Sequence, residues 1–85
     1  MAKIVFFYLM KPLPYRIREA VPLHVEYWKG LHLAGYSGGP FADRSGGMIM
    51  FELASVDAAM PLVDADPFAT SGLLEWRWVK EWLPE

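Results

Sequence analysis

Two short runs of this chain are almost entirely apolar, and they restrict its possible folds more than any other feature. The runs are KIVFFYLM at residues 3–10 and MIMFEL at residues 48–53. Their β-branched and aromatic side chains are typical of β-strands. Successive side chains of a strand point to opposite faces, so a strand that is apolar throughout needs cover on both faces of its sheet.

The segment between these runs predicts one helix and one short strand. Residues 22–34, PLHVEYWKGLHLA, predict a helix with Pro22 in its first turn and Gly35 as its C-terminal stop, after an irregular lead-in. The apolar line along this helix is predicted to be Leu23, Tyr27, Leu31 and Ala34. Residues 36–41, YSGGPF, predict a strand weakened by glycine, and residues 42–47 predict the turn that follows it.

The remaining residues predict a second helix and a last strand. Ser55 is a favourable N-cap for a helix over residues 56–66, and Pro61 is expected to kink or split that helix. Residues 73–82, LLEWRWVKEW, predict a strand. One face of it is predicted to carry Leu74, Trp76, Trp78 and Trp82, and the other Glu75, Arg77, Val79 and Glu81.

The resulting order, β-α-β-β-α-β, is the split βαβ or ferredoxin-like arrangement. We therefore expect one α+β domain over residues 1–85, with a four-stranded antiparallel sheet and two helices on one face. Hydrophobic residues make up 54% of the chain, more than one small core easily hides. A second copy of the same sheet is the expected cover for the other face.

Composition argues against several classes of function. The net charge is −2 and no run of Lys or Arg occurs, so a nucleic-acid partner is not expected. The absence of cysteine excludes disulfides, thiolate catalysis and Cys-ligated zinc, and it fits the cytoplasm. No apolar stretch approaches the ~20 residues of a membrane span. The apolar start of the chain is better explained by a strand than by a signal peptide.

The expected topology brings three distant segments to one end of the sheet. They are the start of the first helix with His24, the turn after Pro40, and the end of the second helix with Asp66. The helix dipole would disfavour a charged His24, whereas a nearby Asp66 would favour it. Such competing influences suit a general base. The alternative is a packed histidine and an ordinary Asp-Pro turn.

A metal or cofactor is not expected. His32 lies about 12 Å from His24 along a helix, which is too far for the two rings to bind one ion. Among the cations, Lys3, Lys11, Arg16 and Arg18 are more simply solvated charges than holders of an anionic substrate.

The stretch GGPFADRSGG at residues 38–47 is a hairpin turn that also suggests the wall of a pocket. It lacks the Lys-Ser/Thr pair of a phosphate-binding loop. We expect Gly39, Pro40 and Phe41 to contact a substrate, with glycine allowing either a close backbone approach or a bulge.

The chain resembles the YCII-related, or YciI-like, family in three features: the histidine at residue 24, GPFADRSGG at residues 39–47 and ADPF at residues 65–68. The resemblance covers nearly the whole chain. It implies a ferredoxin-like fold that pairs into a dimeric α/β barrel, and a pocket whose His–Asp pair falls on His24 and Asp66. The family is related by fold to muconolactone isomerases, and lyase, isomerase or dehydrochlorinase chemistry is suspected for its members.

These observations give three hypotheses for function. The first is a small enzyme without cofactor, in which His24 and Asp66 perform acid–base chemistry on a small organic acid or a cyclic or aromatic compound. The second is a small-molecule-binding or accessory module without turnover. The third is a structural homodimer whose pocket has no function.

Overall fold

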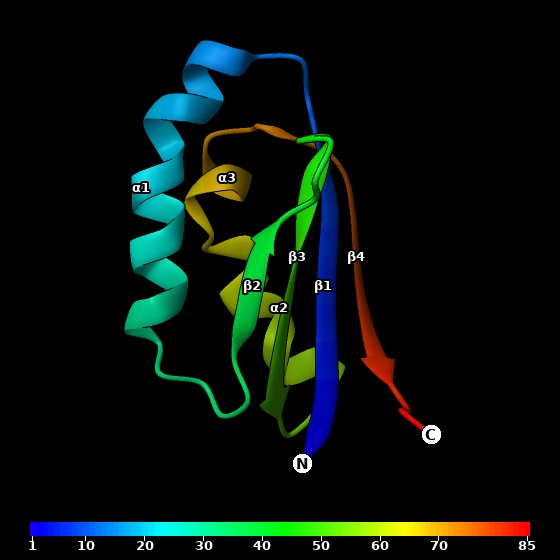
Figure 1. The fold of residues 1–85 in the computed structure, drawn as a ribbon. Helices are drawn as coiled ribbons and strands as arrows, with labels where there is room; N and C mark the ends of the chain where they lie inside the picture. Colours follow the sequence, from blue (N-terminus) through cyan, green and yellow to red (C-terminus); the bar gives the residue numbers. More distant parts are fainter.

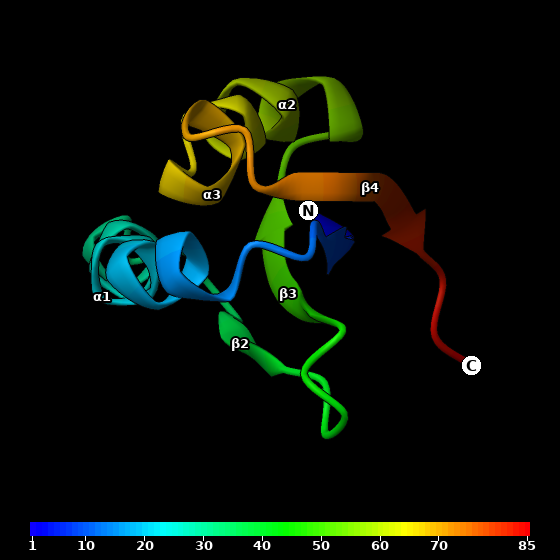
Figure 2. The same ribbon diagram turned by 90° about the horizontal axis from the view of Figure 1, so that it is seen from above.

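The computed structural model describes all 85 residues and confirms the ferredoxin-like arrangement. In chain order the elements are β1 (Ala2–Met10), α1 (Pro14–Gly30), β2 (Ser37–Pro40), β3 (Gly46–Leu53), α2 (Val56–Asp64), α3 (Pro67–Thr70) and β4 (Leu74–Trp82). The four strands form one antiparallel sheet in the order β2-β3-β1-β4. The helices lie together on one side of this sheet (Figures 1 and 2).

Strand β1 lies in the middle of the sheet and supplies the centre of the core. Its side chains Ile4, Phe6 and Tyr8 point to the helices and are buried. Phe6 is paired with Ile49 of β3 and with Val79 of β4, so this row of the core crosses three strands. The predicted burial of β1 is therefore confirmed for the side chains that face the helices.

Helix α1 begins eight residues before the predicted start, at Pro14, and Pro22 lies inside it. Both prolines suit a first helical turn, so the sequence pattern could not distinguish them. The helix ends at Gly30, and Gly35, with φ of +64°, lies in the loop that follows.

The predicted buried face of this helix is only partly confirmed, because Tyr27 and Leu31 pack against the core but Leu23 and Ala34 are exposed. The buried side chains are Ala20, His24 and Trp28, spaced four residues apart, whereas Leu23 is 59% exposed. His24 consequently lies well inside the helix and not in its first turn. The argument from the N-terminal dipole therefore does not apply to it, because that effect is confined to the first turn.

The second helical region is interrupted, but not at Pro61. Ser55 caps α2 as predicted, and its hydroxyl accepts a hydrogen bond of 3.0 Å from the Ala58 amide. Pro61 stays inside α2, and the chain turns at Asp66 instead. Asp66 has extended dihedral angles because the following Pro67 disfavours a helical conformation there. The interruption makes Asp66 the N-cap of α3.

Strand β4 has one irregularity that changes the predicted side-chain pattern. The register between β1 and β4 shifts between Leu9 and Met10, so that Leu74 pairs with Met10 and packs against the core. Leu74 therefore does not share a face with Trp76 and Trp78, as the simple alternation predicted.

The sheet face opposite the helices remains uncovered in the single chain (Figure 2). Val5, Phe7, Met48, Met50 and Trp82 line an apolar depression on the sheet. Phe7 stacks on Trp78 with ring centroids 4.9 Å apart. The chain itself covers the helix side of the sheet, and cover of the other face by a second copy stays a prediction.

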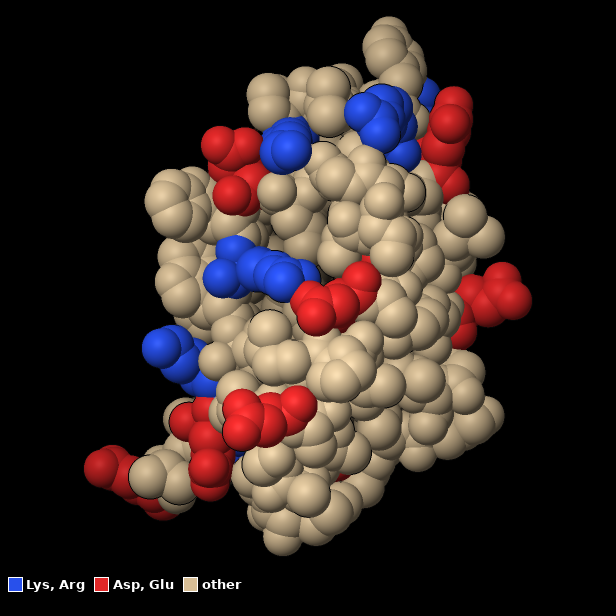
Figure 3. Space-filling model, turned by 180° about the vertical axis from the view of Figure 1, so that it is seen from behind, with Lys and Arg blue, Asp and Glu red and all other residues tan.

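On the side seen from behind, acidic and basic side chains are interspersed over a mostly uncharged surface (Figure 3). No helix reaches the length and hydropathy of a membrane-spanning segment.

Candidate functional site

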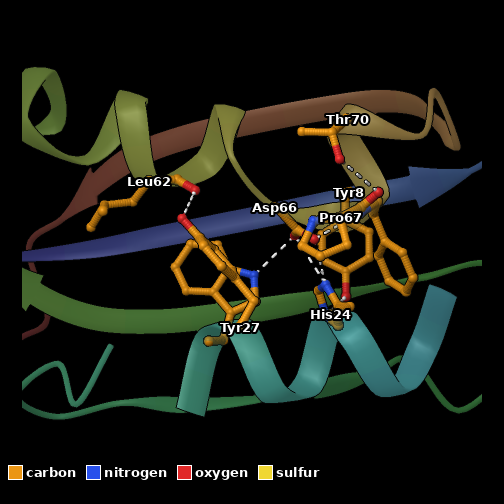
Figure 4. A network of polar contacts seen from close by, with 9 residues as sticks. Tyr8, His24, Tyr27, Leu62, Asp66, Pro67 and Thr70 are labelled. Atoms are coloured by element: carbon orange, nitrogen blue, oxygen red, sulfur yellow. Dashed lines mark hydrogen bonds and ion pairs between the residues drawn. The ribbon is translucent and has the colours of Figure 1, made fainter. Parts of the chain in front are cut away.

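A buried carboxylate lies between the helices. Asp66 has no exposed surface, and its side chain accepts hydrogen bonds from three buried donors on two elements. The donors are His24 Nδ1 at 2.8 Å, Trp28 Nε1 at 2.9 Å and the Phe68 amide at 2.8 Å. Figure 4 shows this network between α1 and the start of α3. A buried carboxylate is tolerated only with such partners, so the network fixes Asp66 in place.

The Asp66 carboxylate also determines which nitrogen of His24 carries a proton. An ionised carboxylate can only accept, so the ring donates from Nδ1 to Asp66. In the neutral ring Nε2 is then a free acceptor, on the edge turned away from Asp66. His24 is 8% exposed, so this nitrogen lies at the base of an opening and not on the open surface.

Aromatic side chains restrict the orientation of the histidine ring. Phe68 stacks on it with centroids 3.9 Å apart and an interplanar angle of 11°. Tyr8 approaches edge-on at 5.9 Å, and its hydroxyl lies 3.3 Å from Nε2. Tyr8, His24 and Asp66 therefore form one hydrogen-bonded chain (Figure 4).

Tyr8 is held as a neutral phenol. Burial raises the pKa of its hydroxyl far above the usual value, and the negative charge of Asp66 raises it further. A neutral Tyr8 can donate its proton to the free Nε2 lone pair. In this state every nitrogen of the His24 ring has a partner.

The two glycines that end the stretch 38–47 make room for Tyr8. A Cβ on Gly47 would lie 2.6 Å from the Tyr8 hydroxyl and 2.7 Å from the Gly39 carbonyl oxygen. A Cβ on Gly46 would collide with the Tyr8 carbonyl oxygen. These glycines therefore allow close packing of the hairpin on β1.

A pocket of about 270 Å³ opens above His24, between α1 and β2. Its lining consists of Tyr8, Val21, His24, Val25, Lys29, Tyr36, Gly38, Gly39, Pro40, Arg44, Ile49 and Phe68. Apolar walls with a few polar groups at one point are typical of small-molecule sites.

The residues singled out in the sequence take different places around this pocket. His24, Gly39 and Pro40 line it. Asp66 lies behind His24 and does not line it. Phe41 is absent from the lining, and its amide instead donates to the Gly46 carbonyl and closes the hairpin.

Several residues at the site were not predicted from the sequence, although weak signals exist for some of them. Tyr8 continues the alternation of Ile4 and Phe6, and Trp28 follows His24 by one helical turn. Phe68 stands two residues after Asp66. The two cations of the pocket, Lys29 and Arg44, were not singled out either, although Arg44 lies in the stretch 38–47 that suggested a pocket wall. Of the cations considered from the sequence, Lys3, Lys11, Arg16 and Arg18, none lines this pocket.

The remaining polar contacts do not extend the site. Arg77 pairs with Asp64 at 2.7 Å on the surface, where both side chains are partly exposed. The fold brings together no group of three or more His, Cys, Asp or Glu side chains that could hold a metal ion.

Comparison with known proteins adds a family and a fold. In the solved structures, the chain is similar to 5-chloro-2-hydroxyhydroquinone dehydrochlorinase (TftG) from Burkholderia phenoliruptrix, in complex with 2,5-dihydroxybenzoquinone. The TM-score is 0.79 and the identity 23%, over 95% of this chain and 93% of that one. No curated protein matches. The sequence pattern of the YCII-related domain matches residues 5–83, and the chain therefore belongs to the YCII-related family.

Proposed function

We propose that this protein is a small-molecule enzyme in which His24 acts as general base and acid and Asp66 orients it. The observation that carries the proposal is the buried contact of 2.8 Å between Asp66 and His24 Nδ1, in a ring that also lines a pocket. This contact leaves Nε2 as the reactive nitrogen. A base held in one tautomer next to a pocket is suited to proton abstraction.

The proposed reaction is an elimination or an isomerisation. Nε2 takes a proton from a substrate carbon or hydroxyl, and the negative charge of Asp66 stabilises the imidazolium that results. In an elimination, the electrons of the broken bond form a double bond and the leaving group departs with its own pair. In an isomerisation, the imidazolium returns its proton to another substrate atom.

The substrate must first take the place of Tyr8 at Nε2. The Tyr8 hydroxyl occupies this nitrogen at a long hydrogen-bond distance of 3.3 Å, so the contact is weaker than those made by Asp66. A substrate hydroxyl or an activated C–H group can then approach Nε2. Tyr8 remains beside it, where its O–H can donate to a substrate oxygen.

The size of the pocket supports a small cyclic or aromatic substrate. Its volume of about 270 Å³ lies below the range of drug-sized sites. The similar dehydrochlorinase is named for 5-chloro-2-hydroxyhydroquinone, and its structure is a complex with 2,5-dihydroxybenzoquinone. Compounds of that size and type are the first substrates to test.

A binding module without turnover is the second candidate. It is favoured by the complete hydrogen bonding of the free site, where no buried side-chain nitrogen or oxygen lacks a partner. In that case His24 and Tyr8 would be structural, and a ligand would occupy the pocket unchanged.

Turnover measurements distinguish the two candidates. Chloride release from 5-chloro-2-hydroxyhydroquinone and related chlorinated hydroquinones is measured for the parent, His24→Gln and His32→Gln. We expect release with the parent and the His32 variant, and none above background with the His24 variant. Binding of the compounds without turnover by the parent, or equal activity of the His24 variant, would contradict the enzyme.

The orientation of His24 has its own test. In ring ¹⁵N NMR spectra the parent should show a protonated Nδ1 on His24, and Asp66→Asn should change the Nδ1 signal but not the His32 signals. Unchanged His24 signals would mean that Asp66 does not determine the tautomer.

We also propose that a second copy of the chain covers the open face of the sheet. Phe7, Met50 and Trp78 on that face form an apolar surface continuous across three strands. Light scattering should give a dimer mass for the parent and a monomer mass for Phe7→Glu. A monomeric parent at micromolar concentration would contradict this pairing.

A further inference from the structure

The pocket above His24 contains an excess of positive charge. Apart from His24, the charged side chains that line it are Lys29 and Arg44, and no acidic side chain lines it. They come from different elements, Lys29 from the last turn of α1 and Arg44 from the turn between β2 and β3. The chain as a whole has a net charge of −2, so this excess is local.

Neither cation is neutralised by an acidic partner. The ion pairs of the molecule are His24–Asp66 and Arg77–Asp64, and neither includes Lys29 or Arg44. The acidic neighbour of Arg44, Asp43, forms no ion pair with it, and its Oδ1 accepts from the Ser45 amide at 3.0 Å and the Ser45 hydroxyl at 2.7 Å. Both cations are therefore free to pair with a ligand.

The backbone at Arg44 is unusual for its residue type. Arg44 has φ of +65°, in the left-handed region that favours glycine. The Asp43–Ser45 hydrogen bonds hold the turn in this conformation. A glycine would fit the position without strain, so the turn gains nothing in stability from an arginine there. The arginine does add a long cationic side chain to the edge of the pocket.

We propose that the pocket selects a small organic anion, with its carboxylate or acidic phenol group recognised by Arg44 and Lys29. This inference rests on the proposed function, because it names the substrate class of the same pocket. Arg44 is the specificity-determining residue, since a guanidinium matches the geometry of a carboxylate. The uncharged part of the ligand lies against the apolar walls, within reach of His24 Nε2.

The test compares two probes of nearly the same shape, one with a charged carboxylate and one with a neutral carboxamide in its place. Binding of 2,5-dihydroxybenzoate and of 2,5-dihydroxybenzamide is followed by NMR through the His24 ring and the Gly39 amide. We expect the acid to bind about tenfold more tightly than the amide, as a charge-assisted hydrogen bond provides. This preference should shrink as salt rises from about 10 mM to about 500 mM.

Three variants assign the preference to these cations. Arg44→Gln removes the charge and leaves a shorter polar side chain on the same strained backbone, and Lys29→Gln is its counterpart on α1. Each should reduce the preference for the acid several-fold and leave the affinity for the amide unchanged. Lys11→Gln is the matched control, because Lys11 lies beside Arg44 on a neighbouring depression and does not line this pocket.

The outcomes separate this inference from the proposed function. Equal affinity for both probes, or an unchanged preference in Arg44→Gln and Lys29→Gln, overturns anion selection while leaving a small-molecule pocket at His24. Binding that does not perturb the His24 ring, or no binding of either probe, overturns the pocket assignment and this inference with it.

Discussion

Replacing Asp66 by alanine removes the acceptor of three buried hydrogen bonds at once. The substitution leaves His24 Nδ1, Trp28 Nε1 and the Phe68 amide without their partner. Breaking a buried ionic network from one side costs about 3–5 kcal/mol. An 85-residue chain has a total stability of about 4–13 kcal/mol, so this one change removes a large share of it.

A second aspartate supplies the matched control. Asp64 also forms an ion pair, with Arg77 at 2.7 Å, but its side chain is 56% exposed. Exposed pairs contribute about 0–1 kcal/mol, so Asp64→Ala should scarcely change stability. Trp28→Phe removes one of the three donors and should fall between the two aspartate variants.

Urea unfolding, followed by tryptophan fluorescence and circular dichroism at one protein concentration, measures these differences. The free energy of unfolding falls by about 1–3 kcal/mol per molar urea, so Asp66→Ala should lower the urea midpoint by more than about 1 M. If Asp66→Ala does not fold, the loss of stability in Trp28→Phe and Asp66→Asn can still be compared with that in Asp64→Ala. An equal loss of unfolding free energy in Asp66→Ala and Asp64→Ala would refute the reasoning, because the burial of Asp66 would then not affect how much its contacts stabilise the fold.

Three further predictions concern the residues around His24. Burial raises the Tyr8 pKa in the folded chain, so above about pH 10 only the unfolded state loses this proton and the stability of the parent falls. Tyr8→Phe should therefore lose less stability than the parent in alkaline solution. Identical pH profiles of stability from urea unfolding would contradict this. Gly47→Ala should lower stability by about 1–3 kcal/mol, because its Cβ would lie 2.6 Å from the Tyr8 hydroxyl. Gly39→Ala is the control, since its Cβ would have nothing within 4 Å. The same thermal midpoint for both variants would contradict the packing argument. Arg44→Gly should raise stability by about 1 kcal/mol by removing the strain of φ at +65°, while the preference for an acidic probe declines; a lower thermal midpoint would show that the arginine stabilises the turn.

Element order was predictable from the sequence because it depends on strong local signals. The uninterrupted apolar character of β1 and β3, the Ser55 cap and the glycine-rich hairpin are all local, and each was placed within one or two residues. The start of α1 was not, because Pro14 and Pro22 both fit a first turn and the buried stripe of this helix, Ala20, His24 and Trp28, is not an apolar repeat. That stripe includes a histidine, whose burial depends on Asp66 and cannot be read locally.

The candidate site was predictable in outline only. The topology brought His24 and Asp66 to the same end of the sheet, and they make contact there. The helical phase of His24 was wrong, because the apolar pattern favoured the leucines. Lys29 and Arg44 were not identified, although Arg44 lies in the stretch that suggested a pocket wall, since placing a long charged side chain at a pocket requires knowledge of which loop faces which helix turn.

The position of Asp66 ties the chemistry to the completion of folding. Its carboxylate joins α1 to a helix of only four residues, through bonds between residues 42 and 38 positions apart in the chain. Such contacts require the long loop between the two segments to close. Until α3 docks, Asp66 cannot orient the His24 ring, so the proposed mechanism predicts that a partly opened chain is inactive. Hydrogen exchange at the Phe68 amide would report the opening that turns the site off.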